Sequence, residues 1–136
     1  MTQGLRYTVD VPGVDEFVRL RVDAGLSEKS REAATRGLAG TCFSVCVRDE
    51  EKLVGMGRVI GDGGCFYQVV DIAVHPDYQR QGIGYRIMTR LMEQLRAGAP
   101  PTAYVSLIAD GDAWKLYEKF GFELTAPASV GMALRL

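Results

Sequence analysis

Residues 69–95, VVDIAVHPDYQRQGIGYRIMTRLMEQL, contain a strand, a glycine-bearing loop and an amphipathic helix in immediate succession. Five of the six residues from 69 to 74 are apolar, which is typical of a strand covered on both faces, and Asp71 interrupts them. From position 83 the apolar residues follow one helical stripe: Ile83, Ile87, Met88, Leu91, Met92 and Leu95. Function is therefore expected where the strand passes into the helix.

The loop at residues 75–84, HPDYQRQGIG, predicts a helix start without a capping side chain. Pro76 ends strand pairing, and Gly82 and Gly84 remove side chains where the helix begins. Free N–H groups at a helix N-terminus, with the positive end of the helix dipole behind them, bind phosphate or pyrophosphate. A dinucleotide fingerprint would need glycine in place of Ile87, and a P-loop would need Gly-Lys-Ser/Thr, so neither pattern is present.

Two segments of the chain resemble the GNAT superfamily of N-acetyltransferases. Gln79, Gly82 and Gly84 match Q/R-x-x-G-x-G/A, the acetyl-coenzyme A signature, after a strand that ends in DIAVHP. LYEKFGF at residues 116–122 resembles the family's LYxKxGF ending. The resemblance implies acetyl-CoA as co-substrate, with its pantetheine arm along the strand and its pyrophosphate in the loop. The binding residues that it implies are Ile72, Ala73, Val74, Gln79, Arg80, Gln81, Gly82, Ile83, Gly84 and Tyr85.

The elements on either side agree with that topology. Upstream, the patterns predict a strand at 5–9, a helix that begins at Val14 and ends just before Gly25, a helix at 27–38 and strands at 41–48 and 53–60. Downstream they predict a strand at 103–109, a helix at 113–120 and closing strands at 122–124 and 131–136. The order β-α-α-β-β-β-α-β-α-β-β is the GNAT fold, in one domain over residues 1–136. This α/β (α+β) fold has a mixed, mostly antiparallel sheet with a splayed parallel pair in the middle.

Composition excludes several other classes of protein. The net charge of −1 gives no general basic field, so no nucleic-acid partner is expected. No apolar run approaches the ~20 residues that cross a membrane, and the N-terminus lacks a signal-peptide core, so a cytoplasmic protein is expected. With one histidine, and three cysteines in no C-x-x-C pair, no metal site is expected. The cysteines are interpreted as small buried hydrophobic residues.

The catalytic expectations concern two proton transfers. An alkyl amine with a pKa of about 10.4 is unprotonated in only about one molecule in 2,500 at pH 7, so its proton must be accepted by some group. Tyr117, which matches the tyrosine of the family motif, is the expected acid for the departing thiolate; the alternative is a core tyrosine. Asp71 is the expected base, because burial would raise its pKa; the alternative is an ion pair with Arg58. Many relatives use a water or a backbone carbonyl instead.

The function expected is transfer of an acetyl group from acetyl-CoA to the primary amine of a small molecule, by direct attack on the thioester. Two alternatives remain open at this point. The first is a non-catalytic module that binds or senses acyl-CoA, and the second is acetylation of a protein N-terminus or lysine. A homodimer is expected only by analogy, because members of the family often dimerise through late strands.

Overall fold

The computed structural model describes residues 4–136, and its elements follow the expected order as far as residue 118. The strands are β1 (Leu5–Thr8), β2 (Thr41–Asp49), β3 (Lys52–Gly61), β4 (Phe66–Val74) and β5 (Tyr104–Ser106). The helices are α1 (Val14–Asp23), α2 (Arg31–Leu38), α3 (Ile83–Gly98) and α4 (Trp114–Glu118), with a 3-10 turn, η1 (Pro76–Tyr78), before α3. The predicted bounds of the long elements are therefore close to the observed ones.

The five strands form one mixed sheet in the order β1-β2-β3-β4-β5. Successive strands from β1 to β4 are antiparallel, as expected for a meander with tight turns, whereas β5 lies parallel to β4. The chain reaches β5 through α3, the helical crossover that a parallel neighbour requires.

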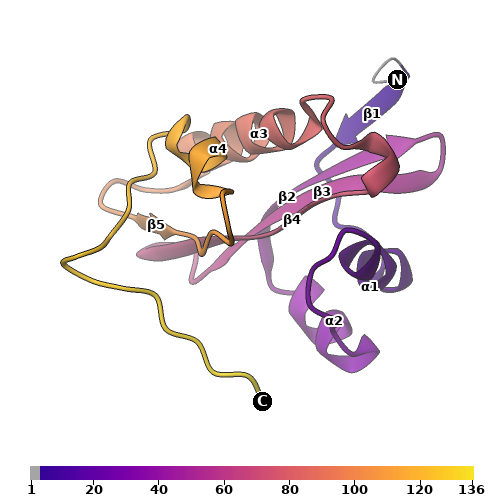
Figure 1. Cartoon of the computed structure of the whole chain (residues 1–136). Helices are drawn as coiled ribbons and strands as arrows, with labels where there is room; N and C mark the ends of the chain where they lie inside the picture. Colours follow the sequence, from indigo (N-terminus) through magenta and orange to yellow (C-terminus); the bar gives the residue numbers. More distant parts are fainter. Residues whose placement is uncertain (1–3) are drawn as a thin grey trace.

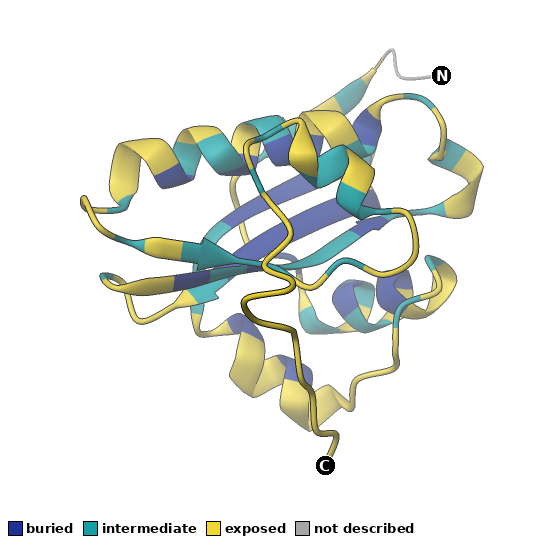
Figure 2. Cartoon of the chain, turned by 60° about the vertical axis from the view of Figure 1, so that its left-hand side comes forward, coloured by how far each residue is buried: buried dark blue, intermediate teal, exposed yellow. Residues whose placement is uncertain are grey.

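Helices cover both faces of the sheet. Figure 1 shows α3 and α4 on one side of the strands and α1 and α2 on the other. The predicted stripe of α3 packs on its face through Ile83, Ile87, Met88, Leu91 and Leu95, all buried. The opposite face is covered by Phe17 and Leu20 of α1 and by Ala34 and Leu38 of α2. Figure 2 shows that the buried residues concentrate on the strands and on the inner sides of the helices.

The two predicted closing strands are wrong for this chain. Neither residues 122–124 nor residues 131–136 form a strand, and β5 is the edge of the sheet. The parallel pair therefore lies at the edge and not in the middle. A strand exists only where a neighbour accepts its hydrogen bonds, and the segment after α4 leaves the body of the molecule instead of returning along β5 (Figures 1 and 2).

The three cysteines differ in their exposure to solvent. Cys46 is buried, which raises the pKa of its thiol to about 12, so it behaves as a small hydrophobic residue; Cys65, in contrast, is exposed. Within residues 4–136, no three His, Cys, Asp or Glu side chains are grouped to hold a metal ion. None of the helices in that range has the length and apolar character needed to cross a membrane.

α3 packs closely on β3 at Gly57, because glycine has no side chain there. A Cβ built there would lie 2.7 Å from atoms of Ile72 and Ile87 and 2.9 Å from Leu91. We expect Gly57→Ala to lower the free energy of unfolding by about 1–3 kcal/mol, because three side chains must move together. Gly37→Ala, in α2 with nothing within 4 Å, should be neutral or up to ~1 kcal/mol stabilising. Urea denaturation of both variants tests this, and equal stability of the two would contradict it.

Candidate active site

A β-bulge in β4 shapes the edge of the sheet. Met56 pairs with Ala73 and Arg58 pairs with Val70, so Asp71 and Ile72 together oppose the single residue Gly57. Asp71 has a φ of +60°, in the left-handed region that aspartate tolerates better than most residues. The bulge was not predicted, although an aspartate inside an apolar strand was the local signal for it.

The pairing of β4 with β5 ends early. The last pair is Gln68 with Ser106, so within residues 4–136 no strand neighbours residues 69–74 of β4 on that side. Backbone groups of Ile72, Ala73 and Val74, the three strand residues expected to bind the coenzyme, lie in this unpaired stretch. An extended ligand with amide groups can add to a strand edge of this kind through main-chain hydrogen bonds.

The N-terminus of α3 is uncapped, as the sequence predicted. Gly82 is the N-cap residue, with φ of 80° and no side-chain cap, and the first turn holds no acidic residue. The first backbone bond of the helix runs from the N–H of Arg86 to the carbonyl of Gly82, at 3.1 Å. The N–H groups of Ile83, Gly84 and Tyr85 therefore have no acceptor within the helix, and an anion placed there would receive all three.

The polar residues of the loop have distinct environments. Gln79 donates from Nε2 to the carbonyl of Val74 at 2.9 Å, which ties the loop to the end of β4. Arg80 has a φ of +65° and is exposed. The Oε1 atom of Gln81 is buried and accepts no hydrogen bond from the residues 4–136. A buried acceptor without a donor is costly, so this atom is available to a donor from water or from a ligand.

The two segments that resemble the family meet in space. A Cβ built on Gly84 would lie 3.8 Å from Leu116, so α4 packs directly on the first turn of α3. The rings of Tyr85 and Phe120 lie 4.9 Å apart, and the Nζ of Lys119 lies 5.9 Å from the Tyr85 ring. The structure therefore brings residues 116–120 against the start of α3.

Tyr117 extends from α4 and is half-buried against the α3 side of the core. Its ring meets Phe122 edge to face, with centroids 6.4 Å apart. Burial raises the pKa of Tyr117 above its ordinary value of 10, and the negative charge of Asp110 raises it further. Its hydroxyl has no hydrogen-bond partner within the described chain. It is therefore protonated at neutral pH and can donate to a ligand.

Asp71 lies buried between two arginines on the opposite side of the sheet. Its carboxylate oxygens accept from Arg21 of α1 and from the Nε of Arg58 on β3, the latter at 2.8 Å. Arg58 also donates to the hydroxyl of Thr41 at 2.7 Å, and both guanidinium groups lie over the ring of Phe17, at 5.4 and 5.9 Å. The pairing with Arg58 is the alternative that the sequence left open. Arg21 was not foreseen, because its role depends on how α1 packs.

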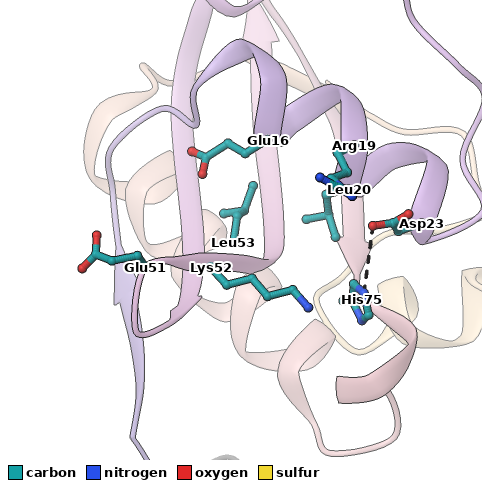
Figure 3. Close-up of a pocket in the computed structure, with 8 residues that line it drawn as sticks. All are labelled: Glu16, Arg19, Leu20, Asp23, Glu51, Lys52, Leu53 and His75. Atoms are coloured by element: carbon teal, nitrogen blue, oxygen red, sulfur yellow. Dashed lines mark ion pairs between the residues drawn. The ribbon is translucent and has the colours of Figure 1, made fainter.

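A hollow of about 440 Å³ lies between α1, the β2–β3 turn and the end of β4 (Figure 3). Its side chains are mostly charged, and the Nε2 of His75 lies 4.0 Å from a carboxylate oxygen of Asp23. The hollow is lined by Glu16, Arg19, Leu20, Asp23, Glu51, Lys52, Leu53 and His75. Because it lies on the α1 side of the sheet and α4 lies on the other, we do not assign it to the chemistry of Tyr117.

Comparison with known sequences identifies acetyltransferases as relatives of this chain. The sequence profile of a family described as "Acetyltransferase (GNAT) domain" matches residues 39–124. An uncharacterized N-acetyltransferase of Pyropia yezoensis is 37% identical over 71 residues, 52% of this chain and 40% of the relative. A GCN5-related N-acetyltransferase named as chloroplastic, from Arabidopsis thaliana, is 32% identical over 62% of this chain and 32% of its own. This chain thus covers well under half the length of these curated relatives.

Solved structures give a longer match. A protein of unknown function from meticillin-resistant Staphylococcus aureus, described as a probable acetyltransferase, is 47% identical with a TM-score of 0.92. The alignment covers 97% of this chain and 99% of that one. Glucosamine-6-phosphate N-acetyltransferase from Arabidopsis thaliana is 15% identical with a TM-score of 0.69, over 96% and 98% of the two chains, and shares the fold alone.

The buried ion-pair cluster predicts a large effect of a small substitution. Asp71→Asn keeps the size of the side chain but leaves two buried guanidinium groups without a carboxylate. We expect the free energy of unfolding to fall by about 3–5 kcal/mol. The matched control is Asp15→Asn, whose side chain is 80% exposed beside Arg31, against 7% for Asp71. That change should cost less than about 1 kcal/mol. Urea denaturation measures both, and similar losses for the two would contradict the assignment.

Proposed function

The chain belongs to the GNAT acetyltransferase family, and from that premise we propose that it transfers an acetyl group from acetyl-CoA to a small-molecule primary amine. The reaction is direct attack of the amine on the thioester, with no acetylated enzyme. The observation that supports the proposal is the packing of α4, which carries Tyr117, on the uncapped start of α3, next to the unpaired stretch of β4.

The residues present fit acetyl-CoA as the co-substrate. The three free N–H groups at the start of α3 favour an anion, and the pyrophosphate supplies one. The unpaired edge of β4 and the buried Oε1 of Gln81 can hydrogen-bond to amides, and the pantetheine arm carries two amides. In this proposal Ile72, Ala73 and Val74 bind the arm, and the loop from Gln79 to Tyr85 binds the pyrophosphate.

Acetyl-CoA, when bound, supplies the carbonyl carbon that the amine attacks and the sulfur that leaves. The C–N bond forms as the C–S bond breaks, and Tyr117 donates its hydroxyl proton to the sulfur. Alignment of amine and thioester is worth ~7–11 kcal/mol, whereas one proton transfer is typically worth ~10²- to 10⁴-fold in rate. Positioning by β4 and α3 therefore contributes more than Tyr117, and loss of the hydroxyl leaves a slow enzyme.

The proton of the amine goes elsewhere than to Asp71 in this proposal. A base must take up a proton, and protonation of Asp71 would break its ion pairs with Arg21 and Arg58. We therefore give Asp71 a positioning role in the bulge of β4. A water molecule beside the unpaired stretch accepts the proton instead, and a backbone carbonyl there can orient the amine by accepting a hydrogen bond from it.

We propose a small-molecule amine as the acceptor, in preference to a protein N-terminus or lysine. We also propose that the reaction takes place in the cytoplasm, as expected from the sequence. An acyl-CoA-binding module without catalysis would need the loop but no acid, and the accessible hydroxyl of Tyr117 favours the enzyme. A panel of small amines and lysine peptides, scored by release of free coenzyme A thiol, separates these acceptors.

Removal of the Tyr117 hydroxyl tests its proposed role as the acid that protonates the departing thiolate. We expect Tyr117→Phe to lower kcat by ~100-fold and to leave the Kd for acetyl-CoA nearly unchanged, because the hydroxyl acts on the departing sulfur. Thiol release at saturating amine measures the rate. Since the pKa of Tyr117 is raised above 10, this group should cause no loss of wild-type rate between about pH 7 and pH 9.

Tyr104→Phe is the control, since it removes the same atom from an exposed side chain on β5. It should retain wild-type turnover. Wild-type turnover in Tyr117→Phe as well would reject the acid, and absence of turnover in every protein, with acetyl-CoA still bound, would favour the binding module.

The left-handed glycine of the loop gives a test of binding. Gly82→Ala introduces strain of roughly 1–2 kcal/mol at φ of 80°. If the loop relaxes to relieve that strain, the Kd for acetyl-CoA should rise by about tenfold. Gly25→Ala carries the same strain at φ of 86°, also with nothing within 4 Å, but lies after α1. Calorimetric titration should show weakened binding in the first variant only; equal affinities would place the pyrophosphate elsewhere.

A further inference from the structure

The hollow of about 440 Å³ beside α1 is lined by charges of both signs, of which several have no partner. The carboxylate of Glu16 is bound by the guanidinium group of Arg48, at 2.8 and 2.7 Å, so its charge is balanced. Arg19 and Lys52 line the same hollow, yet within residues 4–136 neither forms an ion pair. A guanidinium and an ammonium group are therefore free to bind a negatively charged group.

A carboxylate and a ring N–H lie at the same end of the hollow. Asp23 lies 4.0 Å from the Nε2 of His75, which is too far for a hydrogen bond. The Nδ1 of His75 accepts from the N–H of Asp77 at 3.2 Å, so the neutral ring carries its proton on Nε2. Figure 3 shows the ends of Arg19, Asp23 and Lys52 on the side of the hollow where His75 lies. That end offers two cations, one carboxylate and one N–H.

Two leucines form an apolar floor beside these charges. Leu20 of α1 and Leu53 of β3 are both buried and both line the hollow. The remaining carboxylate, that of Glu51, lies on the opposite side of the hollow from His75 (Figure 3). The volume of about 440 Å³ falls in the range of about 300–1,000 Å³ that small-molecule sites occupy. An apolar group can rest on this floor while a charged group reaches the end near His75.

The walls of the hollow are held together by bonds within the chain. The pair of Glu16 with Arg48 joins α1 to β2, and Arg48 also donates to the carbonyl of Glu51 at 3.3 Å. The hydroxyl of Tyr78 in η1 donates to a carboxylate oxygen of Asp49 at 2.5 Å, which joins the segment after β4 to β2. A site with walls already in place binds a ligand without the entropic cost of ordering them.

We propose that this hollow binds one free α-amino acid with an apolar side chain. The carboxylate of the ligand is bound by Arg19 and Lys52, its ammonium group by Asp23, and its side chain packs on the leucine floor. A simple anion would be repelled by Asp23, and a simple amine would leave both cations without a partner. A zwitterion satisfies the three groups at once.

This binding is separate from the chemistry proposed for Tyr117. The hollow lies on the α1 side of the sheet, whereas α4 lies on the other side (Figure 1). It meets the end of β4 at His75, whose N–H donates to the carbonyl of Val54 at 2.8 Å. The amino acid therefore needs neither acetyl-CoA nor turnover in order to bind, and the proposal can be tested without them.

Calorimetric titration of the full chain with L-leucine, in the absence of acetyl-CoA, tests the site. We expect saturable binding with one site per chain. Arg19→Ala combined with Lys52→Ala should raise the Kd by ~100-fold or more, because two charge-assisted contacts are lost. The matched control is Lys29→Ala combined with Arg36→Ala, which removes the same charge from exposed residues outside the hollow. That control should leave the Kd unchanged.

Two analogues test whether both charges of the ligand are needed. Isoamylamine is leucine without its carboxylate, and isocaproate is leucine without its ammonium group. Each should bind at least ~10-fold more weakly than L-leucine, because part of the charged end is left without a partner. Asp23→Asn should weaken L-leucine by ~10-fold and should not weaken isocaproate, because isocaproate has no ammonium group to lose.

The ring signals of His75 in proton NMR give a second readout, because this residue is the only histidine of the chain. L-leucine should shift these signals with the Kd found by calorimetry, in the wild type and in Tyr117→Phe alike. Absence of saturable binding, equal binding of the three compounds, an unchanged Kd in the Arg19 and Lys52 variant, or binding without a shift of His75 would each overturn the proposal. Absence of acetyl transfer would contradict the proposed function alone.

Discussion

A buried carboxylate between two guanidinium groups fixes the place where β4 bends. Arg21 and Arg58 bind the side chain of Asp71 from α1 and β3 and so help to hold its left-handed backbone. The bulge lies just beyond the last pair between β4 and β5, within the stretch of unpaired backbone that we propose binds the coenzyme. The proposed binding at the edge of β4 therefore depends in part on ion pairs buried against α1.

The proposed site also depends on the position of the loop between β4 and α3 relative to the sheet. Gln79 ties the loop to Val74, Gly57 lets α3 approach β3 closely, and the first turn of α3 meets α4 at Gly84 and Leu116. No residue in this arrangement needs to change conformation for the N–H groups of α3 to be available. Preorganised donors of this kind bind an anion without the entropic cost of ordering a loop.

The sequence predicted those parts of the molecule whose signals are local. The stripe of α3, the uncapped helix start at Gly82 and the match around Tyr117 are each contained within a few turns of chain, and the structure brings the last two together. The bulge at Asp71 and its partner Arg21 were missed because they arise from packing between elements 50 residues apart. The strand at 131–136 was predicted from alternation that is real, but a strand also needs an edge to join. Such an edge depends on the arrangement of the whole sheet and not on the local pattern.

The extra residue in the bulge also reverses which side chains of β4 face each side of the sheet. Before it, Tyr67 and Val69 face α3; after it, Ile72 faces α3 and Ala73 faces α1. Odd-numbered residues thus point one way in the first half of the strand and the other way in the second. Loss of a single residue from the bulge would move every downstream side chain of β4 to the opposite face of the sheet. The length of this strand is therefore less free to vary than its composition.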